Sequence, residues 1–302
     1  MFFVWLIKII SIIIMIPYLT LLERKILRYI QIRKGPNKVR LQGLLQPIRD
    51  GVKLLNKDAG SVFRAKIIIF WFRPLFNFFF MLIMFLIFIP IYPTYSINLG
   101  VLIYLCFSSL IVYTVLFSGW RRKSKYSFLG SLRGAAQIIS YEIILLTLIF
   151  FPLIIKHRFN LQFRKFSFPF LWLIFLIIFF IWIITIVAET NRSPFDFAEG
   201  ERELVSGFKT EYGGFLFALL FLGEYGNIIF VRFFSKFLFF SSWLIYWLVP
   251  FTIVLLFLVF RGTFPRFRYD LLMNLAWKII FPFILFFFWV LLIILEKSVF
   301  AR

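Results

Sequence analysis

Eight long apolar stretches, joined by charged connections, limit this chain to one class of fold. A membrane-spanning helix needs about 20 predominantly apolar residues, and the 302-residue chain is 62% hydrophobic. Soluble domains are nearer half apolar. We therefore predict an all-α integral membrane protein in which residues 1–302 form a single polytopic membrane domain. The predicted spans are residues 2–22, 69–90, 98–119, 133–155, 168–188, 213–231, 239–260 and 278–296.

The distribution of lysine and arginine predicts how these spans are oriented. Connections that follow odd-numbered spans hold 24 basic residues, whereas connections that follow even-numbered spans hold six. Basic loops remain on the inner side of the membrane, so we expect the long charged loops to face the cytoplasm or the mitochondrial matrix. The same basic residues suit contact with anionic membrane lipids. Because they are spread over four membrane-proximal loops, they argue against nucleic-acid binding.

The N-terminal sequence and the phenylalanine content bear on localisation. The apolar run begins at Phe2 without the charged region or small-residue cleavage site of a signal peptide. The chain also holds 47 phenylalanines, a bias typical of an A/T-rich organelle genome. We expect a multi-pass protein of the mitochondrial inner membrane, with a bacterial inner membrane as the alternative.

The chain contains one cysteine, Cys106, and one histidine, His157. An iron–sulfur cluster needs about four ligands of the cysteine type, and structural zinc sites also need several Cys or His ligands. We therefore predict no metal site, no covalently bound cofactor and no redox centre on this chain. If the protein takes part in redox chemistry, the redox centres lie on partner chains.

The first inner loop contains a predicted amphipathic helix at about residues 41–57. Its apolar residues recur at helical spacing, and polar residues take the other side, which is typical of a helix lying in the membrane interface. These apolar residues are Leu44, Leu45, Ile48, Val52 and Leu55.

Carboxylates interrupt the later apolar spans. Seven of the thirteen acidic residues lie between Glu189 and Glu224, and Glu142 lies in the middle of the fourth predicted span. A charge at a helix centre costs about 2.5–3.5 kcal/mol on insertion scales. Two interpretations are open: a chain of protonatable groups leading into the membrane, which we favour, or carboxyls that hydrogen-bond neighbouring helices for packing. The chain of protonatable groups would be Glu142, Glu189, Glu211 and Glu224.

The connection at residues 189–212 is an acidic loop with helical features. Ser193 is a predicted N-cap, Pro194 the first helical residue and Asp196 its acidic partner. Clustered carboxylates repel one another, so the loop needs basic partners, unless it is simply solvated. The candidates are Arg24, Arg33, Arg192, Arg202 and the arginines of residues 261–268.

These motifs, in their order along the chain, resemble subunit 1 of respiratory NADH:quinone oxidoreductase (complex I). The resemblance extends over nearly the whole chain, and its most specific part is the acidic block. The matching motifs are E-R-K at 23–25, R-K-G-P-N at 33–37, G-L-L-Q-P-I at 43–48, D-G-V-K-L at 50–54, S-K-Y-S at 124–127, I-S-Y-E at 139–142, A-E-T-N-R-S-P-F-D at 188–196, E-G-E-R-E-L-V-S-G-F at 199–208, E-Y-G-G at 211–214, E-Y-G-N-I-I at 224–229 and R-G-T-F-P-R-F-R-Y-D at 261–270.

The resemblance implies a membrane subunit that forms the quinone-access tunnel and begins the proton path of a proton-pumping enzyme. It implies a ubiquinone-type substrate, FMN and iron–sulfur clusters on partner subunits, and contacts with the hydrophilic-arm subunits, small membrane subunits and lipids. By position, the four glutamates above match the proton path, and Asp196, Glu199, Glu201 and Glu203 match the acidic loop at the quinone cavity. The residues matching the tunnel and its mouth are Glu23, Arg24, Arg33, Arg192, Phe195, Arg268 and Asp270.

Some positions depart from the family's pattern by adding positive charge at the inner face. They are Arg49, Arg121, Arg122 and Arg202. Two other functions stay open on the sequence: the homologous subunit of a membrane-bound hydrogenase, and a stand-alone ion-coupled transporter, because buried glutamates also suit a transporter.

Overall fold

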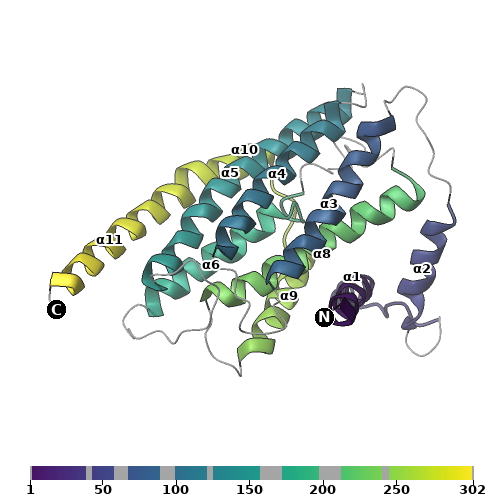
Figure 1. Ribbon diagram of the computed structural model, residues 1–302, viewed down its shortest axis with the longest axis horizontal. Coiled ribbons are helices and arrows are strands. Elements are labelled where there is room, and N and C mark those ends of the chain that lie inside the picture. The colour runs from purple at the N-terminus through teal and green to yellow at the C-terminus, as the bar shows by residue number, and fades with distance from the viewer. Residues whose placement is uncertain are drawn as a thin grey trace.

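The computed structural model describes residues 2–38, 43–57, 67–88, 99–120, 125–156, 172–196, 212–239 and 245–300. All regular secondary structure in these residues is helical (Figure 1), which confirms the predicted fold class. The elements are α1 (Phe2–Ile30), α2 (Gln46–Leu55), α3 (Ile67–Phe88), α4 (Gly100–Trp120), α5 (Lys125–Lys156), α6 (Trp172–Glu189), α8 (Gly214–Phe239), α9 (Ile245–Thr263), α10 (Tyr269–Asn274), a π-helical segment (Leu275–Ile280) and α11 (Phe281–Phe300).

By length and composition, five of the described helices are able to cross a membrane, and three further apolar helices are shorter. The protein is therefore an all-α membrane protein. Each of the eight predicted spans overlaps one of these apolar helices. The eight-span topology, the single domain and the side on which the loops lie remain predictions.

Helix α1 is longer than the first predicted span. It continues past residue 22 to Ile30, so Glu23 and Arg24 lie on a helix and not in the loop that was expected to follow it. Glu23 is buried inside the bundle, whereas Arg24 is half exposed. The difference follows from helical geometry, because consecutive residues on a helix point about 100° apart.

Helix α8 also continues beyond its predicted end at residue 231. It runs to Phe239 and carries Arg232 and Lys236, whose exposed fractions are 3% and 1%. Charged residues within spans normally face the bundle interior, and here the Arg232 guanidinium lies over the ring of Phe257 on α9 at 4.7 Å. The predicted span ends one residue before Arg232, and the burial of this side chain against α9 allows the helix to continue.

The amphipathic helix α2 stands beside α1 and α8 at one edge of the bundle (Figure 1). It begins at Gln46, later than the predicted start, and Leu44, Ile48, Val52 and Leu55 are exposed on it or just before it. Such an exposed apolar face agrees with the predicted position in the membrane interface, which stays a prediction.

The bundle is built around α3, α4, α5 and α8. Helix α3 packs mainly against α8 and α4, while α5 packs against α4 and α6. Aromatic side chains fill much of the interior. The ring of Tyr104 lies 4.5 Å from that of Phe234, and Phe85 meets Phe230 at 5.7 Å.

Two glycines allow α3 and α8 to come close together. A Cβ added to Gly223 would lie 2.8 Å from Asn77 Nδ2 and 3.2 Å from the Asn77 carbonyl carbon, and a Cβ at Gly226 would collide with the side chain of Met81. Small residues at helix contacts permit close backbone packing within membranes. This close approach brings the polar residues of α3 next to those of α8.

We expect Gly223→Ala to destabilise the protein by about 1–3 kcal/mol, the usual cost of overpacking a close contact. Gly51 on α2 is the matched control, because nothing lies within 4 Å of a Cβ built there. Gly51→Ala should be neutral or stabilising by up to about 1 kcal/mol, because alanine favours a helix over glycine. Thermal unfolding of the purified protein measures both, and equal stability of the two variants would contradict the close-contact interpretation.

Candidate functional site

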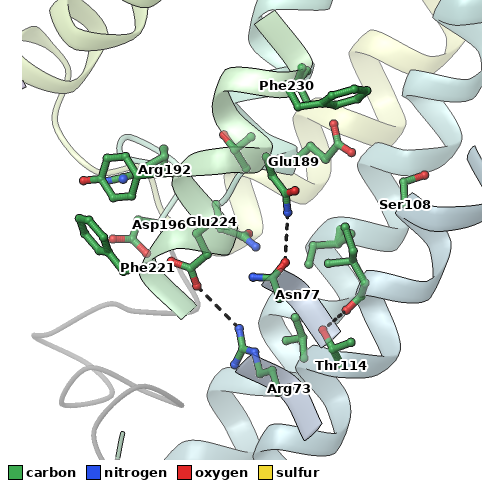
Figure 2. A pocket seen from close by; sticks show the side chains of 18 of the residues that line it. Arg73, Asn77, Ser108, Thr114, Glu189, Arg192, Asp196, Phe221, Glu224 and Phe230 are labelled. Carbon is green, nitrogen blue, oxygen red and sulfur yellow. Dashed lines mark hydrogen bonds and ion pairs between the residues drawn. The ribbon is translucent and has the colours of Figure 1, made fainter. Parts of the chain in front are cut away.

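A cavity of about 590 Å³ lies between α3, α4, α8 and the segment that follows α6. Its wall combines carboxylates and guanidinium groups, as Figure 2 shows. The charged residues on the wall are Arg73, Glu189, Arg192, Asp196, Glu224, Arg261 and Arg266. Charged groups of both signs inside an apolar bundle make this cavity the candidate functional site.

The segment after α6 is held in place by α5 and by the chain beyond α9. The side-chain amide of Gln137, which is fully buried, donates to the carbonyl oxygens of Ala188 at 2.8 Å and Phe195 at 2.9 Å. The Phe267 N–H donates to the Pro194 carbonyl at 3.2 Å. Phe195 and Phe267 also pack together, with ring centroids 5.5 Å apart. These contacts fix the start of the acidic loop against the cavity.

The helix predicted to begin at Pro194 does not begin there. Ser193 and Pro194 lie in a turn, which the Phe195 N–H closes by donating to the Arg192 carbonyl at 2.8 Å. Gln137 binds the Phe195 carbonyl, so a tertiary contact has replaced the local capping pattern that the sequence suggested.

Glu23 is the centre of a buried cluster on one side of the cavity. Tyr225 donates its hydroxyl to Glu23 Oε2 at 2.8 Å, Arg192 lies 3.7 Å from Glu23 Oε1, and Arg261 forms an ion pair with the same oxygen. The Arg192 guanidinium also lies over the Tyr225 ring at 4.0 Å. We call Glu23, Arg192, Tyr225 and Arg261 the Glu23 cluster. It joins α1, α8, α9 and the segment after α6.

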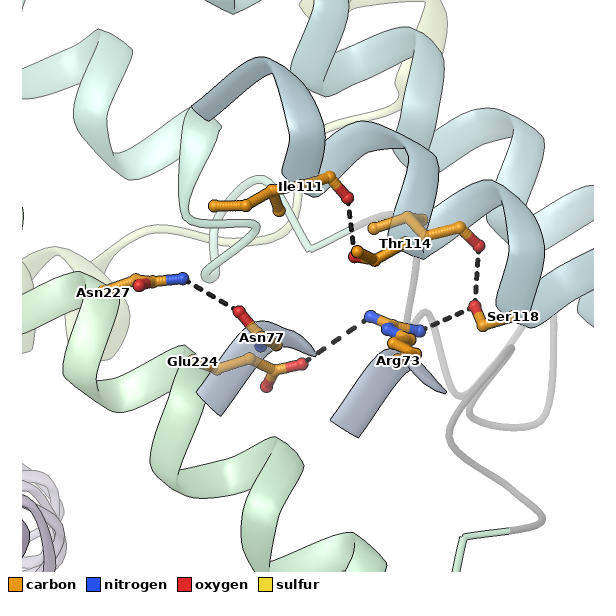
Figure 3. A network of polar contacts seen from close by, with 8 residues as sticks. Arg73, Asn77, Ile111, Thr114, Ser118, Glu224 and Asn227 are labelled. Atoms are coloured by element: carbon orange, nitrogen blue, oxygen red, sulfur yellow. Dashed lines mark hydrogen bonds and ion pairs between the residues drawn. The ribbon is translucent and has the colours of Figure 1, made fainter. Parts of the chain in front are cut away.

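Glu224 faces the cavity from α8 and meets a cation from α3. Arg73 Nη2 lies 3.9 Å from Glu224 Oε1, and Arg73 is only 4% exposed. One helical turn further along both helices, the Asn227 amide donates to Asn77 Oδ1 at 3.2 Å. The α3–α8 contact is therefore polar where it borders the cavity (Figure 3).

Glu189 and Glu142 are connected through one face of α4. Tyr104 donates its hydroxyl to Glu189 Oε1 at 3.3 Å, and Ser108 donates to Glu142 Oε1 at 3.2 Å. Tyr104 and Ser108 are four residues apart, so their side chains lie one above the other on the helix. Glu142 does not line the cavity itself, but Ser108 does.

Two oxygens of residues on the cavity wall, Glu189 Oε2 and Asn191 Oδ1, are buried and accept no hydrogen bond from the described residues. Asn191 adopts a left-handed backbone conformation with φ of 49°, which asparagine tolerates better than most residues. Buried acceptors normally find a partner in the protein or in ordered water.

The structure brings only some of the predicted site residues to the cavity. Glu189, Arg192, Asp196 and Glu224 line it, while Glu23, Glu142 and Phe195 contact its wall or the residues that hold it. The predicted residues Glu199, Glu201, Glu203 and Glu211 lie outside the described residues, as do Arg121, Arg122 and Arg202.

Four predicted tunnel residues lie elsewhere. Arg24 pairs with Asp50 of α2 at 2.7 Å near the surface, and Arg268 pairs with Asp270 at 2.9 Å on an exposed segment. Arg33 and Arg24 line a separate basic hollow of about 800 Å³ beside the end of α1. None of the four lines the cavity.

Other residues of the site were missed by sequence reasoning. Arg73 stood out only as an interruption of the second span, and its partner on α8 is far away in sequence. Tyr104 and Asn77 carried no signal, since single tyrosines and asparagines in apolar spans have many structural roles, and Tyr225 appeared only as part of the motif at 224–229. Only the packing of α3 and α4 against α8 identifies them.

The fold and the cavity define a polytopic all-α membrane protein with an acidic and basic internal site. The family model described as NADH dehydrogenase matches residues 3–293. The chain is 45% identical over 285 residues to NADH-ubiquinone oxidoreductase chain 1 of Aedes aegypti, with 92% of this chain and 90% of that protein covered. It is 43% identical to the protein of the same name from Phoca vitulina (91% and 90% covered), and 43% identical to that from Chondrus crispus (92% and 92% covered).

The chain therefore belongs to the NADH dehydrogenase family, and the family assignment made from its motifs is confirmed. As a member, it is a membrane subunit of an oxidoreductase complex. The match over nearly the whole chain favours this identity over a hydrogenase subunit or a stand-alone transporter.

We expect Glu23→Gln to destabilise the protein by about 2–3 kcal/mol, because it leaves Arg192 and Arg261 without their shared anion. This loss is at or below the roughly 3–5 kcal/mol expected when one partner of a fully buried ion pair is removed, because the Arg261 side chain is 36% exposed. Asp50→Asn breaks the exposed pair with Arg24 and should cost less than about 1 kcal/mol. Thermal inactivation of the assembled enzyme compares the two, and a larger loss for Asp50→Asn would contradict a central role for Glu23.

Proposed function

We propose that this chain forms the membrane-side part of the quinone-access tunnel of a proton-pumping NADH:quinone oxidoreductase, and that its carboxylates begin the proton path. The observation that carries the proposal is the cavity into which Glu189, Asp196 and Glu224 project together. The names of the relatives, which specify NADH and ubiquinone, support the substrate pair. Partner subunits would bind FMN and the iron–sulfur clusters and supply the electrons.

In this proposal the chain contacts the hydrophilic-arm subunits that carry the terminal iron–sulfur cluster, the neighbouring small membrane subunits, and lipids. The mitochondrial inner membrane is its location, with the charged loops facing the matrix. The animal relatives agree with a mitochondrial origin.

A row of aromatic side chains on α8 suits an isoprenoid tail. Phe217, Phe221 and Tyr225 line the cavity at successive turns of the helix. The ring centroids of Phe221 and Tyr225 are 4.3 Å apart, and those of Phe217 and Phe221 are 6.5 Å apart. Apolar surface removed from water stabilises binding by about 25 cal/mol per Å², so such a row would hold a long apolar tail while polar groups orient the headgroup.

Reduction of a quinone to a quinol takes up two electrons and two protons. Groups near the headgroup that change protonation during this reaction would pass the change to their neighbours. Glu189 is in contact with Tyr104, and Ser108 on the same face of α4 is in contact with Glu142. We propose this sequence of groups as one branch of the proton path and Glu224 as a second protonatable group on the cavity wall. Glu211 and the acidic loop with Glu199, Glu201 and Glu203 belong to the same proposal.

We expect Glu142→Gln and Glu224→Gln to reduce the number of protons translocated per electron in the assembled enzyme, because glutamine cannot exchange a proton. Glu296→Gln is the control, since Glu296 is exposed near the end of α11. Enzyme reconstituted in vesicles allows NADH oxidation and acidification to be measured together. An unchanged ratio in both variants, with normal quinone reduction, would refute the relay. Loss of assembly alone would support a packing role.

Tyr104→Phe removes the hydroxyl that contacts Glu189 and leaves the ring contact with Phe234 in place. We expect stability to fall by about 1 kcal/mol, the usual contribution of a hydrogen bond. We also expect the rate of proton translocation to fall more than the rate of NADH oxidation. The same vesicle assay measures this. Equal losses of both activities would argue for a structural hydroxyl.

A further inference from the structure

Arg73 is a buried cation that enters the cavity from the second turn of an apolar helix. It lies on α3, which carries no other charged residue, and its exposed fraction is 4%. A guanidinium stays protonated in proteins, so it remains a positive charge in a place where charge is costly. Such a group needs polar or anionic partners from neighbouring helices.

The guanidinium reaches partners on two sides (Figure 3). Its Nη1 donates to Ser118 Oγ on α4 at 2.9 Å, and its Nη2 lies 3.9 Å from Glu224 Oε1 on α8. The Ser118 hydroxyl in turn donates to the Val115 carbonyl at 2.6 Å, which fixes the position of its oxygen. The planar shape of arginine allows it to use both ends at once.

The contact with Glu224 is longer and looser than the contact with Ser118. At 3.9 Å it is an ion pair without a hydrogen bond, and the Glu224 side chain is 26% exposed toward the cavity. The arginine is therefore anchored on α4, and its contact with the carboxyl on α8 is the weaker of the two.

The close approach of α3 and α8 sets this geometry. Asn77, one turn after Arg73, meets both Gly223 and Asn227. These contacts hold the α3 backbone at a fixed distance from the turn of α8 that carries Glu224. Arg73 thus has a defined place relative to the carboxyl, in addition to its own anchor.

Building on the proposed function, we propose that Arg73 is a positioning residue for Glu224: anchored on Ser118, it orients the ionised carboxyl toward the cavity and releases it when the carboxyl takes up a proton. Proton uptake at Glu224 removes one charge of the pair, and Arg73 keeps its bond to Ser118. Each proton that arrives at Glu224 therefore alters a contact between α3 and α8. In this step a proton binds to the Glu224 carboxylate, and no other covalent bond forms or breaks.

Four forms of the assembled enzyme in vesicles test the inference: the unchanged protein, Arg73→Gln, Glu224→Gln and the double variant. We expect Arg73→Gln to lower the number of protons translocated per electron by more than it lowers the rate of quinone reduction. In the Glu224→Gln background, adding Arg73→Gln should cause no further loss, because residues that act as a unit are not additive. Arg73→Lys, which keeps the charge, should restore part of the ratio.

Arg232→Gln is the matched control for removing a buried cation. Arg232 is 3% exposed on α8, stacks on Phe257 and does not line the cavity. We expect the enzyme that assembles with this variant to keep its ratio of protons to electrons.

The outcomes separate this inference from the proposed function. A normal ratio in Arg73→Gln, or additive losses in the double variant, overturns the role of Arg73 even if Glu224→Gln is impaired and the proton path stands. A normal ratio in Glu224→Gln removes Glu224 from the path and with it this inference. If Arg73→Gln fails to assemble but the double variant assembles, the pairing is supported. If both fail, Arg73 is structural and the inference is overturned.

Discussion

Compensation of charge inside an apolar bundle is the constraint on which this structure depends. A charge at the centre of a membrane helix is costly, so each buried ion must meet a partner from another element. Glu23 on α1 meets Arg192 and Arg261, and Arg73 on α3 meets Glu224 on α8. These contacts converge on one cavity. The interactions that make buried charge tolerable are therefore the ones that shape the site.

The same contacts connect protonation to packing. The pair between Arg73 and Glu224 lies beside the close contact of α3 with Gly223, so a proton that neutralises the carboxyl acts at a helix interface. Glu189 sits at the end of α6, where Gln137 holds the start of the acidic loop. In the proposed proton path, a change of charge in the cavity would reach the helices and the loop through these direct contacts.

The sequence was most informative where the signal is local. Hydrophobic length predicted the all-α membrane fold, and motifs in family order predicted the family. Helix ends were less predictable: the sixth span was predicted to end at residue 231, but burial of Arg232 against α9 lets α8 continue to Phe239. Arg268 and Asp270 were assigned to the tunnel from their motif; they pair with each other on an exposed segment away from the cavity, and their role stays a prediction. A motif identifies a segment, and does not say which of its side chains point inward.

The sequence by itself determined that the chain spans a membrane, that it belongs to an oxidoreductase family, and that carboxylates interrupt its apolar spans. These conclusions depend on residue type and spacing along the chain. Only the tertiary structure decided which acid meets which base. The hydrogen bond from Tyr225 to Glu23 joins residues 202 positions apart, and that from Tyr104 to Glu189 joins residues 85 apart. Such partners are chosen by how the helices pack, because spacing along one helix fixes only the face on which a side chain lies.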